Sequence, residues 1–168
     1  GIRDDLVTGV QTCALPICIG EVIAYELSKT LNYQSKDIRT PLGECRVEML
    51  SDEIVIATIL RAGLPLHNGL LNYFDNAQNC FVSAYRRHTH GDEFDIQIEY
   101  LASPDITGKV LILADPMLAT GSSLLLCYQA ILAKGTPSHT HIVSAIGSQQ
   151  GVEYLQNNLP ENRSEEHT

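Results

Sequence analysis

Two repeating patterns of apolar and polar positions divide the chain into short segments. Four apolar runs of five to seven residues are bounded by polar or turn-forming residues, which is typical of strands buried on both faces of a parallel sheet. These runs cover residues 54–60, 80–85, 110–114 and 142–146. Residues 94–100 instead alternate between apolar and polar side chains, which predicts a half-buried strand.

The segments between the apolar runs carry apolar residues three or four positions apart, the spacing of an amphipathic helix. The expected helices cover residues 19–31, 64–74, 124–134 and 149–158. Gly135 and Pro137 follow the third helix and explain where it stops. The polar stretch 32–46, which contains Pro41 and Gly43, is expected to form a loop.

Helices and strands therefore alternate along the chain. This order predicts an α/β fold with a central parallel sheet flanked by helices. Residues 80–85 and 94–100 are separated by a short polar segment, so they are expected to pair as a protruding β-hairpin whose turn covers residues 88–93.

Residues 115–123 carry the clearest chemical signal in the chain. Asp115 follows the buried strand, and a loop of small residues leads through Thr120 and Gly121 into a helix. Free backbone N–H groups at the start of a helix favour an anion, and a glycine lets the backbone approach a phosphate. Asp115 can accept hydrogen bonds from sugar hydroxyls. A ligand with a phosphate and a ribose would satisfy both ends. A plain strand–turn–helix unit capped by Ser and Thr is the alternative.

Basic residues follow two other predicted strands. Arg61, Ala62 and Gly63 follow the first apolar run, and Arg86 follows the second. Because the carboxyl ends of parallel strands share one edge of a sheet, Arg61, Arg86 and Asp115 are expected to converge on one anionic ligand. Taken alone, Arg61 could equally be an ordinary surface arginine.

Composition narrows the classes of function. The net charge of −9 argues against general nucleic-acid binding, and no apolar run reaches the ~18 residues of a membrane span. Cys45, Cys80 and Cys127 lack metal-ligand spacing and are interpreted as buried free thiols of a reducing cytoplasm. His88 and His90 lack a matching acid cluster and are interpreted as solvated loop residues.

The two ends of the chain share a coding coincidence. Residues 12–17 read TCALPI and residues 163–168 read RSEEHT. The codons ACG TGT GCT CTT CCG ATC encode the first string, and with one further T their reverse complement encodes the second. This resembles a sequencing adapter translated at both ends, so residues 1–18 and 163–168 are expected to be non-native. Each end carries a net charge of −1, which leaves −7 for residues 19–162, an incomplete single domain.

The string DPMLATGSS at residues 115–123 resembles the phosphoribosyl diphosphate (PRPP) loop of uracil phosphoribosyltransferases, within the type I phosphoribosyltransferase superfamily. Most of that superfamily has two adjacent acids at this point, whereas the uracil enzymes and this chain have Asp-Pro. The resemblance extends over residues 19–162. It implies a type I fold and a glycosyltransferase (pentosyltransferase) reaction of pyrimidine salvage, in which uracil and PRPP give UMP and pyrophosphate.

The resemblance also implies roles for individual residues. Asp115 and Arg86 are expected to be catalytic: Asp115 holds the ribose hydroxyls, and Arg86 and Arg61, with Mg²⁺ bound alongside PRPP, neutralise the leaving pyrophosphate. Arg87 is a weaker candidate for that second role. The expected PRPP-binding residues are Arg61, Ala62, Gly63, Arg86, Asp115, Pro116, Met117, Leu118, Ala119, Thr120, Gly121, Ser122 and Ser123. The hairpin would form a mobile lid over this site, with a simple edge hairpin as the alternative.

Uracil recognition in this family uses a Gly- and Asp-containing segment that follows one further strand. No such segment precedes Asn162, so this chain is expected to bind PRPP but to make little UMP. The resemblance further implies a cytoplasmic homo-oligomer, with GTP as an effector in some members. No direct metal ligand, nucleic acid or membrane partner is expected. A PRPP-binding regulator and a non-catalytic homologue of the same fold are the alternative functions.

Overall fold

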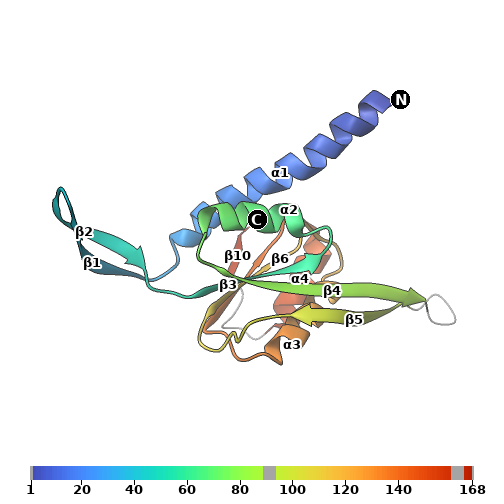
Figure 1. Cartoon of the computed structure of the whole chain (residues 1–168). Coiled ribbons are helices and arrows are strands. Elements are labelled where there is room, and N and C mark those ends of the chain that lie inside the picture. The colour runs from blue at the N-terminus through green and yellow to red at the C-terminus, as the bar shows by residue number, and fades with distance from the viewer. Residues whose placement is uncertain (1, 89–93, 160–164, 168) are drawn as a thin grey trace.

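A six-stranded sheet forms the centre of the computed structural model, which describes residues 2–88, 94–159 and 165–167, with side chains for residues 14–84 and 98–159 (Figure 1). The strand order is β10-β8-β6-β3-β4-β5, and every neighbouring pair is parallel except β4 and β5. The bounds are β3 (Ile54–Leu60), β4 (Gln78–His88), β5 (Phe94–Ala102), β6 (Val110–Ala114), β8 (His139–Val143) and β10 (Glu165–His167). The predicted α/β fold with a mostly parallel sheet is confirmed.

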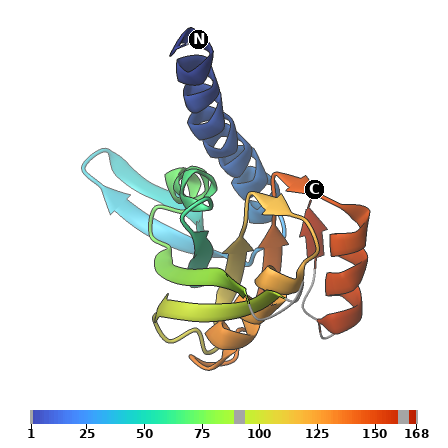
Figure 2. The ribbon, with the colours of Figure 1, turned by 90° about the vertical axis from the view of Figure 1, so that its right-hand side faces the viewer.

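Helices cover both faces of this sheet (Figures 1 and 2). They are α1 (Ile2–Ser28), α2 (Leu64–Tyr73), α3 (Ser122–Leu132) and α4 (Gln149–Asn158). Because successive strand residues point to opposite faces, Ile54 and Ile56 of β3 pack with α1 and α2, whereas Val55 and Ala57 pack with α3. The sheet is therefore buried on both sides, as its continuous apolar runs indicate.

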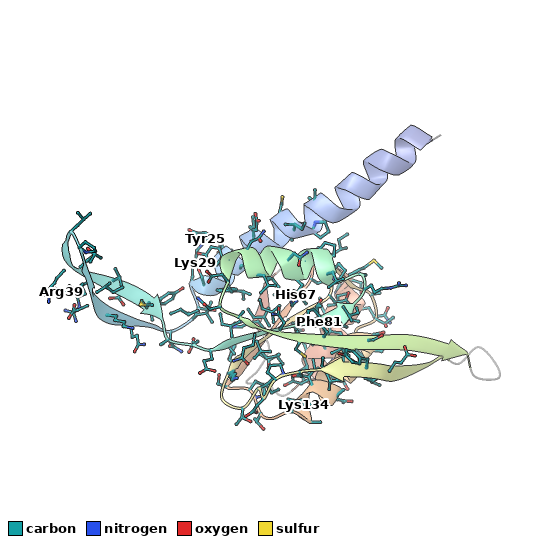
Figure 3. All side chains as sticks on the ribbon, in the orientation of Figure 1. Tyr25, Lys29, Arg39, His67, Phe81 and Lys134 are labelled. Atoms are coloured by element: carbon teal, nitrogen blue, oxygen red, sulfur yellow. The ribbon has the colours of Figure 1, made fainter. Side chains whose placement is uncertain are left out.

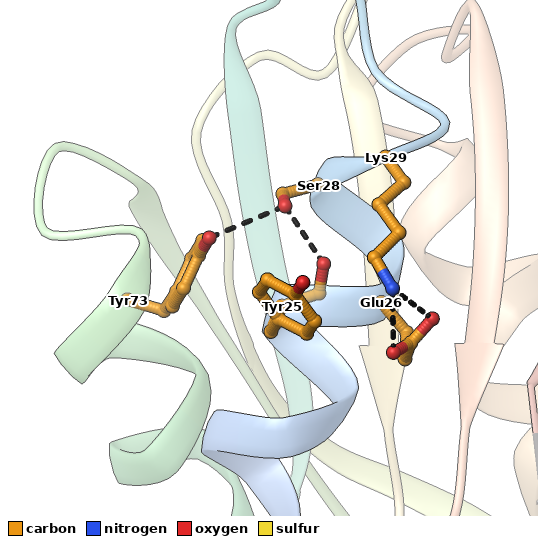
Figure 4. A network of polar contacts seen from close by, with 5 residues as sticks. All are labelled: Tyr25, Glu26, Ser28, Lys29 and Tyr73. Atoms are coloured by element: carbon orange, nitrogen blue, oxygen red, sulfur yellow. Dashed lines mark hydrogen bonds and ion pairs between the residues drawn. The ribbon is translucent and has the colours of Figure 1, made fainter.

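Two glycines allow α1 and α2 to cross closely. A Cβ on Gly69 would lie 2.1 Å from the carbonyl oxygen of Ile17, and one on Gly20 would lie 2.6 Å from that of Leu66. Polar contacts join the two helices further along (Figure 4), where the Ser28 hydroxyl lies 3.3 Å from the Tyr73 hydroxyl. This pairing fixes α2, whose first residue follows the predicted Arg61–Gly63 turn.

The expected loop at 32–46 is wrong. This stretch belongs to an antiparallel hairpin of β1 (Tyr33–Thr40) and β2 (Gly43–Leu50), which projects from the body of the molecule (Figure 1). Its side chains are mostly exposed on both faces, so the sequence lacks the one-sided apolar alternation that marks a half-buried strand. A two-residue turn, Pro41-Leu42, closes the hairpin.

The second hairpin, predicted from residues 80–100, is confirmed as β4 and β5, with a register shift between Ser83 and Ala84. His88 is the last residue of β4, not part of the turn. His90 and the rest of the turn lie outside the described residues, so a role as a lid stays a prediction.

Some element boundaries differ from expectation. The first helix runs from Ile2 through Pro16 to Ser28, so residues 2–18 continue the helix expected from residue 19. Strand β8 begins at His139, three residues before the predicted start. Ile146 lies in a separate short strand, β9 (Ile146–Gly147), which pairs with β7 (Met117–Leu118). In the described part of the chain, no helix is long and apolar enough to cross a membrane.

Candidate PRPP-binding site

The strand register brings the predicted site segments to one edge of the sheet. Thr58 of β3 pairs with Ala114 of β6, and Leu60 pairs with Ser83 of β4. Arg61 and Asp115 therefore follow the ends of neighbouring parallel strands. Arg86 lies on the same side, in the part of β4 that extends beyond β3, although its side chain lies outside the described side chains. This edge is where α/β folds place their ligands.

Asp115 is a half-buried carboxyl at the start of the loop. Its backbone N–H donates to the Val143 carbonyl over 3.1 Å, and its Oδ1 accepts a long hydrogen bond of 3.4 Å from the Met117 N–H. Burial raises the pKa of Asp115, and the Met117 N–H partly opposes that rise. A carboxylate that has lost water and gained one weak donor can accept hydrogen bonds from ribose hydroxyls.

The loop after Asp115 encloses a small cavity of about 120 Å³. Its lining residues are Asp115, Met117, Leu118, Ala119, Thr120, Gly121, Ser123 and Leu124. All but Leu124 belong to the nine-residue string that the sequence singles out. Pro116 and Ser122 are half-buried members of the string outside this lining.

Helix α3 starts at this cavity without a side-chain cap. Gly121, the N-cap, has a φ of 78° and makes no side-chain capping bond. The first turn closes with the Leu125 N–H donating to the Gly121 carbonyl over 2.9 Å, so Ser122, Ser123 and Leu124 have N–H groups without an acceptor in the helix. The Thr120 and Ser122 hydroxyls lie 2.9 Å apart. Free N–H groups, hydroxyls and the helix dipole together favour a phosphate.

The turn after β3 is held against β6. Arg61 and Ala62 are exposed, and Gly63 is buried at the N-cap of α2, again without a side-chain capping bond. A Cβ on Gly63 would lie 2.1 Å from the Thr58 hydroxyl oxygen. Glycine is therefore needed here for packing, and the turn lies against Ala114, the residue before Asp115.

A magnesium ion that arrives with the substrate would meet one carboxylate at this cavity. Among the residues that the structure describes, no three His, Cys, Asp or Glu side chains gather where they could hold a metal. Mg²⁺ is commonly held by one or two carboxylates together with substrate phosphates and water. Asp115 is the carboxylate that lines this cavity, so it is the residue that would face such an ion.

The cysteine prediction is correct at two positions and wrong at one. Cys80 and Cys127 are buried free thiols, but Cys45 is exposed on the β1–β2 hairpin. Burial, followed by the negative charge of Asp115, raises the pKa of Cys127 to about 12. Cys127 is therefore a neutral packing residue beneath the site.

Sequence reasoning missed the residues that support the loop from behind. Ser144, Ser148 and Gly151 contact the Asp115 loop through hydrogen bonds or close packing. Ser148 had a readable signal, because a serine directly before a helical pattern is a typical N-cap. Ser144 and Gly151 carried none, since their partners lie far away in the sequence.

Solved structures share this fold. The AQ2163 protein from Aquifex aeolicus superposes with a TM-score of 0.79 at 30% identity, covering 89% of this chain and 70% of that protein. A hypoxanthine phosphoribosyltransferase from Staphylococcus aureus superposes with a TM-score of 0.58 at 17% identity, covering 92% and 70%. The fold, an α/β domain with a mostly parallel central sheet, is that of the phosphoribosyltransferases.

Sequence comparison identifies the family within that class. The family model described as "Uracil phosphoribosyltransferase" matches residues 1–163. The chain is 58% identical over 144 residues to the uracil phosphoribosyltransferase of Porphyromonas gingivalis, covering 86% of this chain and 67% of the relative. It is 36% identical over 137 residues to that of Methanothermobacter thermautotrophicus, covering 80% and 63%. The chain belongs to the uracil phosphoribosyltransferase family of glycosyltransferases, and it spans about two thirds of the length of these relatives.

Proposed function

We propose that this chain carries the PRPP site of an enzyme that transfers ribose 5-phosphate from PRPP to uracil, giving UMP and pyrophosphate. Membership of the family supports the reaction. The observation that carries the assignment of the site is the juxtaposition of the half-buried Asp115 carboxyl with the uncapped start of α3. These two features match the two ends of a ribose 5-phosphate group.

Each part of the site has a separate task in this proposal. The N–H groups and hydroxyls from Thr120 to Ser123 bind the 5′-phosphate, and Asp115 binds the ribose hydroxyls. Arg61 and Arg86 bind the pyrophosphate and stabilise its charge as the bond to the ribose breaks. Mg²⁺ bound with PRPP would add positive charge at the pyrophosphate. The transition state carries positive charge on the ribose ring, so the protein acts by positioning and charge stabilisation.

Calorimetric titration with Mg-PRPP tests this proposal. We expect the chain to bind PRPP and Asp115→Asn to bind at least tenfold more weakly, because a hydrogen bond to a charged group contributes about 1.5–3 kcal/mol. Asp75→Asn is the matched control, since Asp75 is an exposed acid that follows the C-terminal end of α2. Absence of binding by the unaltered chain would reject the site and favour a non-catalytic homologue.

Little UMP formation by this chain stays a prediction. Residues 19–162 as the native domain, GTP as an effector and a cytoplasmic location also stay predictions. The chain's negative net charge supports the enzyme over an RNA-binding regulator. The conversion of radiolabelled uracil and the binding of PRPP should be measured on the same sample. Together they distinguish a chain that binds PRPP without making UMP from a chain that does not bind PRPP.

A homo-oligomer is proposed from the β1–β2 hairpin. Ile38, Cys45, Val47 and Met49 lie on one face of the hairpin, where Cys45 and Met49 are exposed and Ile38 and Val47 are half-buried. An isolated two-stranded hairpin is marginally stable in water, so this face needs a partner. A second copy of the chain offers the same surface in return. Sedimentation equilibrium should give a dimer or larger, with Val47→Glu dissociating it and Glu44→Gln on the opposite face leaving it intact.

A further inference from the structure

The segment from Ser144 to Gly151 packs against residues 115–121, which we call the phosphate loop after their proposed function. The Ile146 N–H donates to the Pro116 carbonyl over 3.2 Å, and the Ser148 N–H donates to the Leu118 carbonyl over 2.8 Å. The Leu118 N–H donates in turn to the Ser144 hydroxyl over 3.1 Å. Three hydrogen bonds therefore join the loop to this segment.

The Ser148 hydroxyl joins two elements at once. As the N-cap of α4, with φ −85° and ψ 146°, it accepts a hydrogen bond of 2.9 Å from the Gly151 N–H. The same hydroxyl donates its hydrogen to the Ala119 carbonyl. One side chain thus anchors the first turn of α4 and the middle of the phosphate loop.

Close packing holds this arrangement. A Cβ on Gly151 would lie 2.5 Å from the Ala119 carbonyl oxygen, and one on Gly121 would lie 3.0 Å from the Gly151 carbonyl oxygen. The backbones of the loop and of α4 are therefore in direct contact.

The direction of the Ala119 carbonyl has a consequence for the ligand. In a trans peptide the C=O and the following N–H point in opposite directions. A carbonyl of Ala119 held on Ser148 therefore turns the Thr120 N–H away from α4. Thr120 is one of the residues that line the cavity where a phosphate would lie.

We propose that Ser148 is a positioning residue, whose hydroxyl holds the Ala119 carbonyl so that the Thr120 N–H is preset to bind the 5′-phosphate. This inference rests on the proposed function of the loop. Because a preorganised donor avoids the cost of ordering the loop on binding, its loss lowers affinity without removing any direct ligand contact.

Three variants separate positioning from helix capping. Ser148→Ala removes both roles, and Ser148→Thr restores a hydroxyl that can fill both. Ser148→Gly retains most of the stability of the cap, since glycine at an N-cap costs only a few tenths of a kcal/mol, but it has no donor for Ala119. Ser51→Ala is the control. The Ser51 hydroxyl also donates to a carbonyl distant in the sequence, that of Asn32, over 2.9 Å, and this bond lies away from the site.

The test is calorimetric titration of these variants with ribose 5-phosphate, with urea denaturation of the same samples. We expect Ser148→Ala and Ser148→Gly to bind about tenfold more weakly, and Ser148→Thr and Ser51→Ala to bind like the unaltered chain. If affinity instead follows the free energy of unfolding, with Ser148→Gly near normal, Ser148 is only a helix cap and the inference is wrong. If the unaltered chain binds neither ribose 5-phosphate nor Mg-PRPP, the proposed function fails as well.

Discussion

The hydroxyl of Thr58 donates to the carbonyl oxygen of Ala114 over 3.1 Å, between residues 56 positions apart in the chain. Ala114 directly precedes Asp115. The same Thr58 hydroxyl lies against Gly63, where an added Cβ would be 2.1 Å from its oxygen. One buried hydroxyl therefore connects the two halves of the candidate site: the Arg61 turn and the Asp115 loop.

Thr58→Val tests this connection. Valine has nearly the same shape but no hydroxyl, so the Ala114 carbonyl loses a donor in a buried environment. We expect the free energy of unfolding to fall by about 1–3 kcal/mol in urea denaturation. Thr30→Val is the control, because the Thr30 hydroxyl makes a similar 2.8 Å bond to the Leu27 carbonyl at an exposed position. Equal losses in the two variants would mean that the buried Thr58 bond contributes no more to the free energy of unfolding than the exposed Thr30 bond.

Asp115→Asn should separate stability from function. Burial raises the pKa of Asp115 above 3.8 in the folded protein, so the contribution of this group to stability is complete below pH 3.8 and is lost as pH rises through the folded-state pKa. At pH 7 the buried charge is therefore a cost that asparagine removes. We expect Asp115→Asn to be at least as stable as the unaltered chain at pH 7 while it loses PRPP affinity. A clear fall in its urea midpoint at pH 7 would contradict this electrostatic assignment.

His67 predicts a second pH effect, in the acid range. The ring is buried between α2 and β4 beside Phe81 (Figure 3), with its Nε2 2.7 Å from the Asn79 Oδ1. Burial lowers the pKa of His67 from 6.5, so the unfolded chain binds a proton more readily than the folded one. The stability present above pH 6.5 should fall as pH drops toward the folded-state pKa. Urea denaturation between pH 7.5 and about 5 should show this fall, and His67→Gln should flatten it.

Gly121→Ala should harm both folding and phosphate binding. Alanine at a φ of 78° costs about 1–2 kcal/mol, and its Cβ would also lie 3.0 Å from the Gly151 carbonyl oxygen. Gly108→Ala is a matched control, because Gly108 has a φ of 73° and nothing within 4 Å of an added Cβ. Both variants should lose stability, and Gly121→Ala should lose more. Ribose 5-phosphate affinity should fall in Gly121→Ala alone; a fall in both would point to a general effect of instability.

The elements that could be predicted from the sequence are those in which buried apolar positions form a continuous run or recur at a regular spacing. Strand β6 matches its predicted bounds, because all five of its residues are buried and apolar. The β1–β2 hairpin was missed because its two faces are both largely exposed, which leaves no periodic signal. The hairpin is explained by cross-strand pairs such as Ile38 with Cys45, which no local pattern reveals.

The candidate site likewise has residues that could be predicted from the sequence and residues that could not. The residues that would touch a ligand lie in continuous strings, 61–63 and 115–123, where chemistry and spacing can be read together. The residues that support them are distant in the sequence: Thr58 reaches Ala114, and Ser148 reaches Ala119 across 29 positions. Such pairs are set by strand order and helix packing, so they required the structure.

The most direct test of the account is a ¹⁵N–¹H correlation spectrum of the chain titrated with ribose 5-phosphate. The account predicts that the largest shifts fall on the backbone N–H groups from Thr120 to Leu124, with smaller changes at Met117. It also predicts that Asp115→Asn weakens the titration without moving its location. Shifts concentrated elsewhere, such as on the β1–β2 hairpin, or no shifts at millimolar ligand, would contradict the assignment of residues 115–123 as the phosphate site.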